Sequence, residues 1–289
     1  MSDRPSRFIT ARDGLRLHYL DFAGDPSLAP KTPVVCLPGL ARSADDFIPL
    51  AKRLAAQGRR VLALDYRGRG LSQWDADWRH YALEVEQDDS LAVLADAGVD
   101  AAVFFGTSRG GLHIMKLAEK RAAMIRAAVF NDVGPRVELD GLLRIRRYVG
   151  KLPPLPSMED AAALMRLSAG MHFSGVDPQD WATYARQTFV EKDGKVQLRY
   201  DPELSHTLDD IENDLAREDF WVGFDALAAV PLLAIRGANS DILSDGTLDD
   251  MEARHPGMER LVVPGQGHAP LLLDAPTLEA IDRFFAPLA

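Results

Sequence analysis

The stretch from 103 to 111 constrains the fold more than any other part of the sequence. The apolar residues 101–105 precede the pentapeptide Gly-Thr-Ser-Arg-Gly at 106–110, and a segment of helical periodicity follows at 112–123. This order predicts a strand, a tight turn and a helix. Such a turn crowds its central residue, so glycine is needed two positions before and two positions after it. We therefore expect Ser108 to stand exposed at a strand end; the alternative is an ordinary turn whose serine caps a helix.

Short apolar runs alternate with helical periods over most of the chain. The runs lie at 34–37, 61–64, 101–105, 125–130, 231–235 and 261–263, and the helical periods at 45–56, 81–97, 112–123, 248–254 and 278–288. An Asp-Gly turn at 13–14 predicts an opening hairpin within 7–22. Alternating strands and helices predict an α/β fold with a mostly parallel sheet flanked by helices. Ligands of such sheets bind beyond the carboxyl ends of the strands.

The alternation stops at Arg136 and resumes only after 218. Helical periods lie at 142–149, 158–171 and 181–189, and the Asp-Gly pair at 193–194 predicts a small hairpin turn. The interruption is far longer than the ~2–6 residues of an ordinary connection in an α/β unit. We therefore divide the chain into a first core part at 1–135, an inserted, mainly helical cap at 136–218 and a second core part at 219–289.

Charge and cysteine content exclude several classes of protein. The chain of 289 residues carries a net charge of -10, which argues against nucleic acid and anionic membranes as partners and leaves a small molecule. Its single cysteine, Cys36, lies in an apolar run and is expected in the core. No apolar run reaches the ~18–20 residues of a membrane helix, so we expect a cytoplasmic protein. The oligomeric state stays open.

Two residues suit the chemistry that a serine at a strand end needs. A serine hydroxyl becomes a nucleophile when a neutral imidazole accepts its proton and a carboxylate fixes the tautomer of that imidazole. His268 and Asp241 each follow a predicted strand through a glycine-rich loop, so both should lie at the same sheet edge as Ser108. No spacing typical of metal ligands is present, and the turn at 106–111 lacks the dinucleotide fingerprint. We expect neither a metal nor a cofactor.

These motifs resemble the α/β-hydrolase superfamily, in the branch with a helical cap after the sixth strand. The matching stretches are the elbow at 106–110, the motif Asp-x-Arg-Gly-x-Gly-x-Ser at 65–72, the acid loop at 237–241 and the Gly-His pair at 267–268. The resemblance covers the core from the first hairpin to the last helix. It implies an oxyanion hole formed by the backbone N–H groups of Leu40 and Arg109. Many relatives have His-Gly after the third strand, whereas this chain has Pro-Gly at 38–39, so one side-chain contact is missing.

Two aspartates compete for the role of triad acid. The resemblance favours Asp241, because its Gly-x-x-Ser-Asp setting matches the family better. Asp132 follows the sixth predicted strand, where some relatives carry the acid, and otherwise lines the pocket or holds the cap hinge. The ordinary alternatives are a helix N-cap for Asp241 and a turn for Asp132.

Three further residues are candidates for binding the substrate. Arg109 is suited to pair with a substrate carboxylate, and the alternative is an ion pair with a neighbouring acid such as Asp132 or Glu119. His172 either faces the pocket from the cap or packs on a helix surface. Trp221 either forms an apolar pocket wall or packs in the core.

The resulting hypothesis is a cofactor-independent serine hydrolase that cleaves a small ester, lactone or related acyl substrate. A second hypothesis is hydrolysis of a carbon–carbon bond in a 1,3-diketone-like acid, which capped relatives with the same triad perform and for which Arg109 is the supporting feature. A third is a small-molecule receptor with a hydrolase-like core.

Overall fold

The computed structural model describes residues 5–213 and 218–288. Residues 1–4, 214–217 and 289 lie outside the described residues. They include the first residues of the first predicted core part, residues 214–217 of the predicted cap and the last residue of the second core part. Among the described residues, an eight-stranded sheet has the order β1-β2-β4-β3-β5-β6-β9-β10. Its strands are β1 (Ser6–Thr10), β2 (Arg16–Phe22), β3 (Lys31–Leu37), β4 (Arg59–Asp65), β5 (Ala102–Thr107), β6 (Ile125–Asn131), β9 (Leu232–Gly237) and β10 (Glu259–Val263).

The sheet is parallel from β4 to β10, as the alternating pattern predicts. The β1–β2 and β2–β4 pairs are antiparallel, and the other pairs run parallel. The opening hairpin turns at Gly14, whose φ of 91° suits a residue without a side chain. The predicted α/β fold with a mostly parallel sheet is confirmed.

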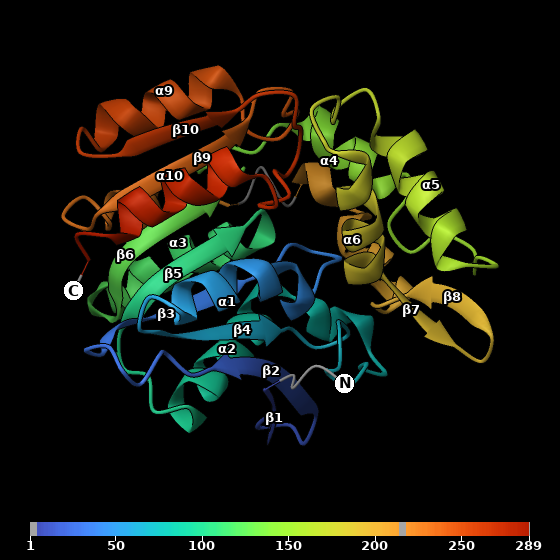
Figure 1. Ribbon diagram of the computed structural model, residues 1–289, viewed down its shortest axis with the longest axis horizontal. Coiled ribbons are helices and arrows are strands. Elements are labelled where there is room, and N and C mark those ends of the chain that lie inside the picture. The colour runs from blue at the N-terminus through green and yellow to red at the C-terminus, as the bar shows by residue number, and fades with distance from the viewer. Residues whose placement is uncertain (1–4, 214–217, 289) are drawn as a thin grey trace.

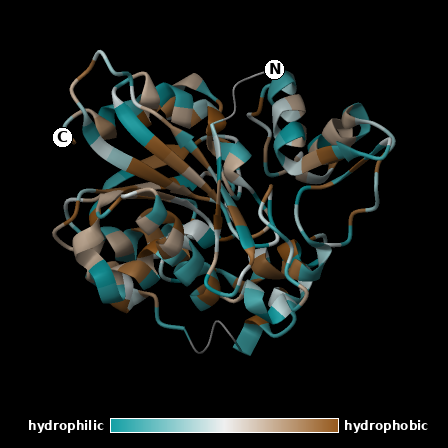
Figure 2. Ribbon diagram, turned by 90° about the horizontal axis from the view of Figure 1, so that it is seen from below, coloured by the Kyte–Doolittle hydropathy of each residue, from teal (hydrophilic) through white to brown (hydrophobic). Residues whose placement is uncertain are grey.

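Helices cover both faces of the sheet. Side chains alternate along β3, so that Val34 and Cys36 belong to one apolar cluster and Val35 and Leu37 to the other. One face packs on α1 (Ile48–Ala55) and α10 (Ala275–Phe285), which lie in front of the strands in Figure 1, and the other on α2 (Leu83–Asp96), α3 (Arg109–Arg121), α8 (Trp221–Asp225) and α9 (Asp245–Arg254). Figure 2 shows the hydrophobic residues concentrated in the strands between these layers. Cys36 is fully buried, as predicted.

The long interruption of the pattern forms a group of elements between β6 and β9. They are α4 (Leu139–Arg146), α5 (Met158–Ala169), α6 (Pro178–Thr188), β7 (Phe189–Lys192), β8 (Lys195–Leu198) and the 3-10 helix η4 (Pro202–Leu208). The predicted hairpin is present, with β7 and β8 paired antiparallel around Asp193 and Gly194. These elements share a buried cluster that includes Phe189 and Leu204, and Figure 1 shows them together beside one end of the sheet. The domain boundaries at 136 and 218 stay a prediction.

Three short 3-10 helices lie in the core part of the described chain: η1 (Ala44–Phe47), η2 (Trp78–Tyr81) and η3 (Ala122–Met124).

Among the helices of the described residues, none combines the length and the apolar character that crossing a bilayer requires.

Candidate active site

The turn between β5 and α3 has the geometry that its glycines predict. Ser108 has φ 51° and ψ -116°, a backbone conformation that side-chain-bearing residues rarely adopt. A Cβ on Gly106 would lie 2.4 Å from the carbonyl carbon of Gly110, and a Cβ on Gly110 would lie 2.1 Å from the oxygen of Leu37. Both glycines are therefore required by the close approach of three backbone segments.

We expect Gly106→Ala to destabilise the fold by at least about 1–3 kcal/mol, because the new methyl group overlaps backbone that has no room to move. Gly246→Ala is the matched control, since a Cβ there meets nothing within 4 Å in the first turn of α9. The free energy of unfolding in urea measures both changes. Equal stabilities of the two variants would contradict this account of the turn.

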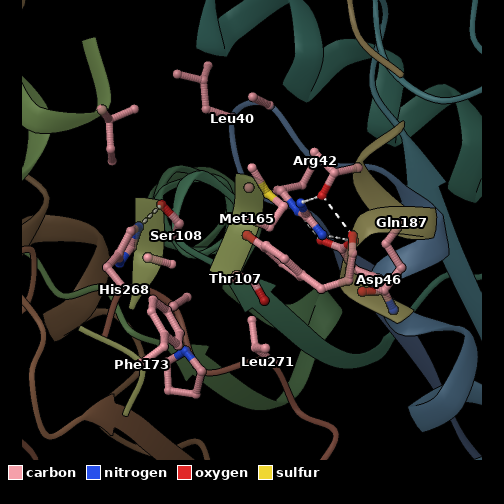
Figure 3. A pocket seen from close by; sticks show the side chains of 18 of the residues that line it. Leu40, Arg42, Asp46, Thr107, Ser108, Met165, Phe173, Gln187, His268 and Leu271 are labelled. Atoms are coloured by element: carbon pink, nitrogen blue, oxygen red, sulfur yellow. Dashed lines mark hydrogen bonds and ion pairs between the residues drawn. The ribbon is translucent and has the colours of Figure 1, made fainter. Parts of the chain in front are cut away.

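Ser108, His268 and Asp132 follow three different strands, and their side chains form one hydrogen-bonded series. His268, in the loop after β10, has its Nε2 2.8 Å from Ser108 Oγ and its Nδ1 2.8 Å from Asp132 Oδ2. Asp132 is fully buried, and its carboxylate also accepts hydrogen bonds from the Gly237 N–H at 2.7 Å and from Ser240 Oγ at 2.6 Å. Figure 3 shows the pair of Ser108 and His268 joined by a dashed line.

The prediction that Asp241 orients His268 is wrong. The Asp241 carboxylate forms a two-point ion pair with Arg144 of α4, at 2.5 Å to Nε and 2.8 Å to Nη2. Burial alone raises the pKa of Asp241, but the Arg144 guanidinium outweighs it and holds that pKa below its ordinary value.

Strand register explains why Asp132 reaches the histidine. Thr107 of β5 lies opposite Asn131 of β6, so the next residues, Ser108 and Asp132, leave adjacent strands side by side. Asp132 has φ 60°, which turns the chain sharply at this point. The acid is thus placed by the end of its own strand, whereas Asp241 lies four residues beyond the end of β9.

A cavity of about 250 Å³ opens beside Ser108 and His268, between the strand-end loops and the insertion. Leu40 and His172 line it, which for His172 is the first of the two alternatives, and their roles toward substrate stay predictions. Met165 and Phe173 also line it from the insertion, and Figure 3 shows both around the same space.

Arg109 and Trp221 do not line this cavity, and their prediction as substrate-binding side chains is wrong. Arg109 Nε donates to Glu86 Oε2 at 2.6 Å, so the ion-pair alternative holds, with a different acid from the two considered. Trp221 packs edge-to-face against Phe224 of its own helix and under the guanidinium of Arg254.

Sequence reasoning missed a polar wall of the cavity. Arg42 donates two hydrogen bonds to Asp46, at 2.7 and 2.6 Å, and its guanidinium stacks 4.2 Å from the ring centre of Tyr184. The spacing of the pair gave no signal, because Arg42 lies in the loop before η1 and not on the same helix as Asp46. Asn131, also lining the cavity, donates to Thr107 Oγ1 and to the Pro270 oxygen, both at 3.1 Å.

One group of side chains among the described residues has the spacing of metal ligands. Ligand atoms of Asp13, Asp75 and His80 lie within 4.8 Å of one another. Arg67 Nη1 donates to the two carboxylates at 2.9 and 2.8 Å, so a guanidinium is already their cationic partner in this structure.

Comparison with known proteins identifies the family. A family model described as alpha/beta hydrolase fold matches residues 32–154. The chain is 32% identical over 280 residues to a 3-hydroxybutyrate-oligomer hydrolase of Cupriavidus necator, covering 93% of this chain and 92% of the relative. The chain belongs to the α/β-hydrolase family. This hydrolase is also 25% identical to the esterase YbfF of Escherichia coli, over 82% of this chain and 86% of the relative.

A solved structure agrees with the assignment. The crystal structure of an alpha/beta hydrolase from Novosphingobium aromaticivorans superposes on this α/β-hydrolase with a TM-score of 0.90 and 40% sequence identity, covering 99% of each chain.

Proposed function

We propose that this hydrolase cleaves a small ester or lactone, with Ser108 as nucleophile, His268 as general base and Asp132 as the acid that orients the histidine. The observation that carries the proposal is the continuous hydrogen-bonded series from Ser108 Oγ to His268 to Asp132, with 2.8 Å at each step. As Oγ attacks the ester carbonyl, its proton passes to Nε2, and the same proton then passes to the leaving alkoxide. Water repeats the sequence on the acyl-enzyme and restores Ser108.

The proposed oxyanion donors are the backbone N–H groups of Leu40 and Arg109. Arg109 is the first residue of α3, so its N–H is among the four that have no partner within the helix, at the positive end of the helix dipole. Leu40 lines the cavity in the loop after β3, which pairs with β5. Donors at these two places suit the negative charge that develops on the carbonyl oxygen.

The cavity supports a small substrate. Its volume of about 250 Å³ lies below the ~300–1,000 Å³ common for ligand pockets. The Cupriavidus necator relative is named for oligomers of 3-hydroxybutyrate, in which the links between units are esters. We therefore propose short esters of small hydroxy acids, together with simple esters and lactones, as the substrate class.

A substrate panel tests the proposal. Purified enzyme is assayed with p-nitrophenyl acetate, a small lactone, the dimer and trimer of 3-hydroxybutyrate, and a dienoic diketone acid. We expect sustained turnover of esters. Arg109, the feature that supported carbon–carbon cleavage, is bound by Glu86, so we expect no turnover of the diketone acid. Turnover of that acid alone would contradict the proposal, and ligand binding with no turnover of any substrate would favour a receptor.

Cap substitutions are expected to alter substrate choice while the serine stays reactive. Met165→Ala and Phe173→Ala enlarge the cavity and should change the ratio of kcat/KM between long and short acyl esters by about tenfold. Met171→Ala is the matched control, because Met171 is 92% exposed. Labelling by a small fluorophosphonate should persist in all three variants. Loss of labelling in a folded cap variant, as complete as in Ser108→Ala, would mean that the insertion supplies catalytic groups.

A further inference from the structure

Glu86 of α2 is a fully buried carboxylate that pairs with two arginines. Its Oε1 accepts a hydrogen bond from Arg69 Nη1 at 2.5 Å, and its Oε2 accepts one from Arg109 Nε at 2.6 Å. His113 of α3 lies 3.1 Å from the same Oε2. None of these four residues is among those that line the cavity. The proposed reaction uses the backbone N–H of Arg109 and gives the side chains of this cluster no part.

Each arginine connects Glu86 to a backbone segment that carries one of the proposed oxyanion donors. Arg69 Nε donates to the carbonyl oxygen of Leu40 at 2.8 Å, which fixes the loop after β3. Arg109 is itself the residue after Ser108, so its side chain anchors the first turn of α3. The two oxygens of one carboxylate thus connect the two backbone segments that carry the donors.

The charges in the cluster favour a permanently ionised Glu86. Burial alone raises the pKa of Glu86, but the guanidinium groups of Arg109 and Arg69 outweigh it and hold that pKa well below its ordinary value. Burial lowers the pKa of His113, which keeps that imidazole neutral. The connection between the two donor segments is therefore present throughout the neutral pH range.

We propose that Glu86 is a positioning residue that holds the N–H groups of Leu40 and Arg109 at the separation that an oxyanion requires. The proposal rests on the proposed function. Donors fixed in advance stabilise the transition state without reorganising, and a misplacement of about 1 Å is able to cost about a hundredfold in rate. If Glu86 only stabilised the fold, replacing it would lower the free energy of unfolding and would not change how strongly the folded enzyme stabilises the transition state.

Two variants break the connection in different ways. Glu86→Gln keeps the shape of the side chain but places an N–H group against one of the arginines, which is strongly destabilising in a buried site. Arg109→Met keeps the backbone N–H, and it leaves Glu86 paired with Arg69, so this variant tests the proposal if the first does not fold. Asp89→Asn is the matched control. Asp89 lies one turn further along α2, is buried, and forms a two-point pair with Arg67 at 2.7 and 2.8 Å.

The experiment compares the transition state with the ground state. For each variant we measure kcat and KM for p-nitrophenyl acetate, inhibition by a trifluoromethyl ketone that forms an anionic tetrahedral adduct, and inhibition by an unreactive ether analogue of the substrate. For Glu86→Gln and Arg109→Met we expect kcat and trifluoromethyl ketone affinity to fall together by about a hundredfold. KM and affinity for the ether should change little, and Asp89→Asn should lose stability alone.

Three results would overturn the proposal. One is wild-type kcat and ketone affinity in a folded Arg109→Met variant. Another is a loss of kcat in Asp89→Asn as large as in Arg109→Met, which would reduce Glu86 to a general role in stability. The third is a wild-type enzyme that neither turns over esters nor binds the ketone, which would remove the proposed function itself.

Discussion

Replacing Ser108 with alanine is expected to lower kcat for ester hydrolysis by about 10⁶. Alanine has no oxygen to attack the carbonyl, so only the oxyanion hole and the pocket still contribute to the rate. Members of a triad act as a unit, so Ser108→Ala/His268→Ala should cost little more than either single change. Steady-state kinetics on the three variants measures the losses, and unfolding curves confirm that each one folds. Single losses that add up in the double variant would contradict a shared role.

The second large effect separates the two aspartates. Asp132→Asn should lower kcat by about 10⁴, because the amide donates toward His268 Nδ1 and favours the tautomer that cannot accept the serine proton. Asp241→Asn removes only the pair with Arg144, which is partly exposed and contributes at most about 1 kcal/mol to stability. Its kcat should stay close to that of the wild type.

Matched kinetics on these two isosteric variants decides the assignment. Asp132 is buried at 2.8 Å from His268, whereas Asp241 is partly exposed and paired with Arg144, so the account predicts a large loss of kcat in Asp132→Asn alone. A much larger loss in Asp241→Asn than in Asp132→Asn would return the orienting role to Asp241.

The sequence predicts those parts of the fold that short-range chemistry determines. Glycines at 106 and 110 are required by local crowding, and they therefore mark the turn at Ser108 without knowledge of the rest of the chain. The helices and strands follow from the periodicity of apolar residues. The Asp-Gly pairs at 13–14 and 193–194 likewise mark both hairpins.

The triad acid is not determined in this way. Asp132 and Asp241 both follow strands that end at the same edge of the sheet. The choice depends on which strands are neighbours and in which register, because the pairing of Thr107 with Asn131 brings Ser108 and Asp132 together. Arg144, which binds Asp241, belongs to the insertion, and the sequence does not show how the insertion packs on the core.

The same limit explains the errors for Arg109 and Trp221. The partner of Arg109 is Glu86, on a helix more than twenty residues earlier whose packing against α3 is a property of the whole fold. Trp221 has the apolar surface of a pocket wall, yet α8 packs on α3, and its ring contacts Phe224. Residue type alone did not separate a pocket wall from a helix contact.

Covalent labelling tests the central claim, the reactivity of Ser108, most directly. Native enzyme is treated with a fluorophosphonate probe, and peptide mass spectrometry locates the adduct. The account predicts one adduct, on Ser108, which forms at the wild-type rate in Asp241→Asn, slowly in Asp132→Asn and not at all in Ser108→Ala. An unlabelled native enzyme, or an adduct on any other residue, would contradict it.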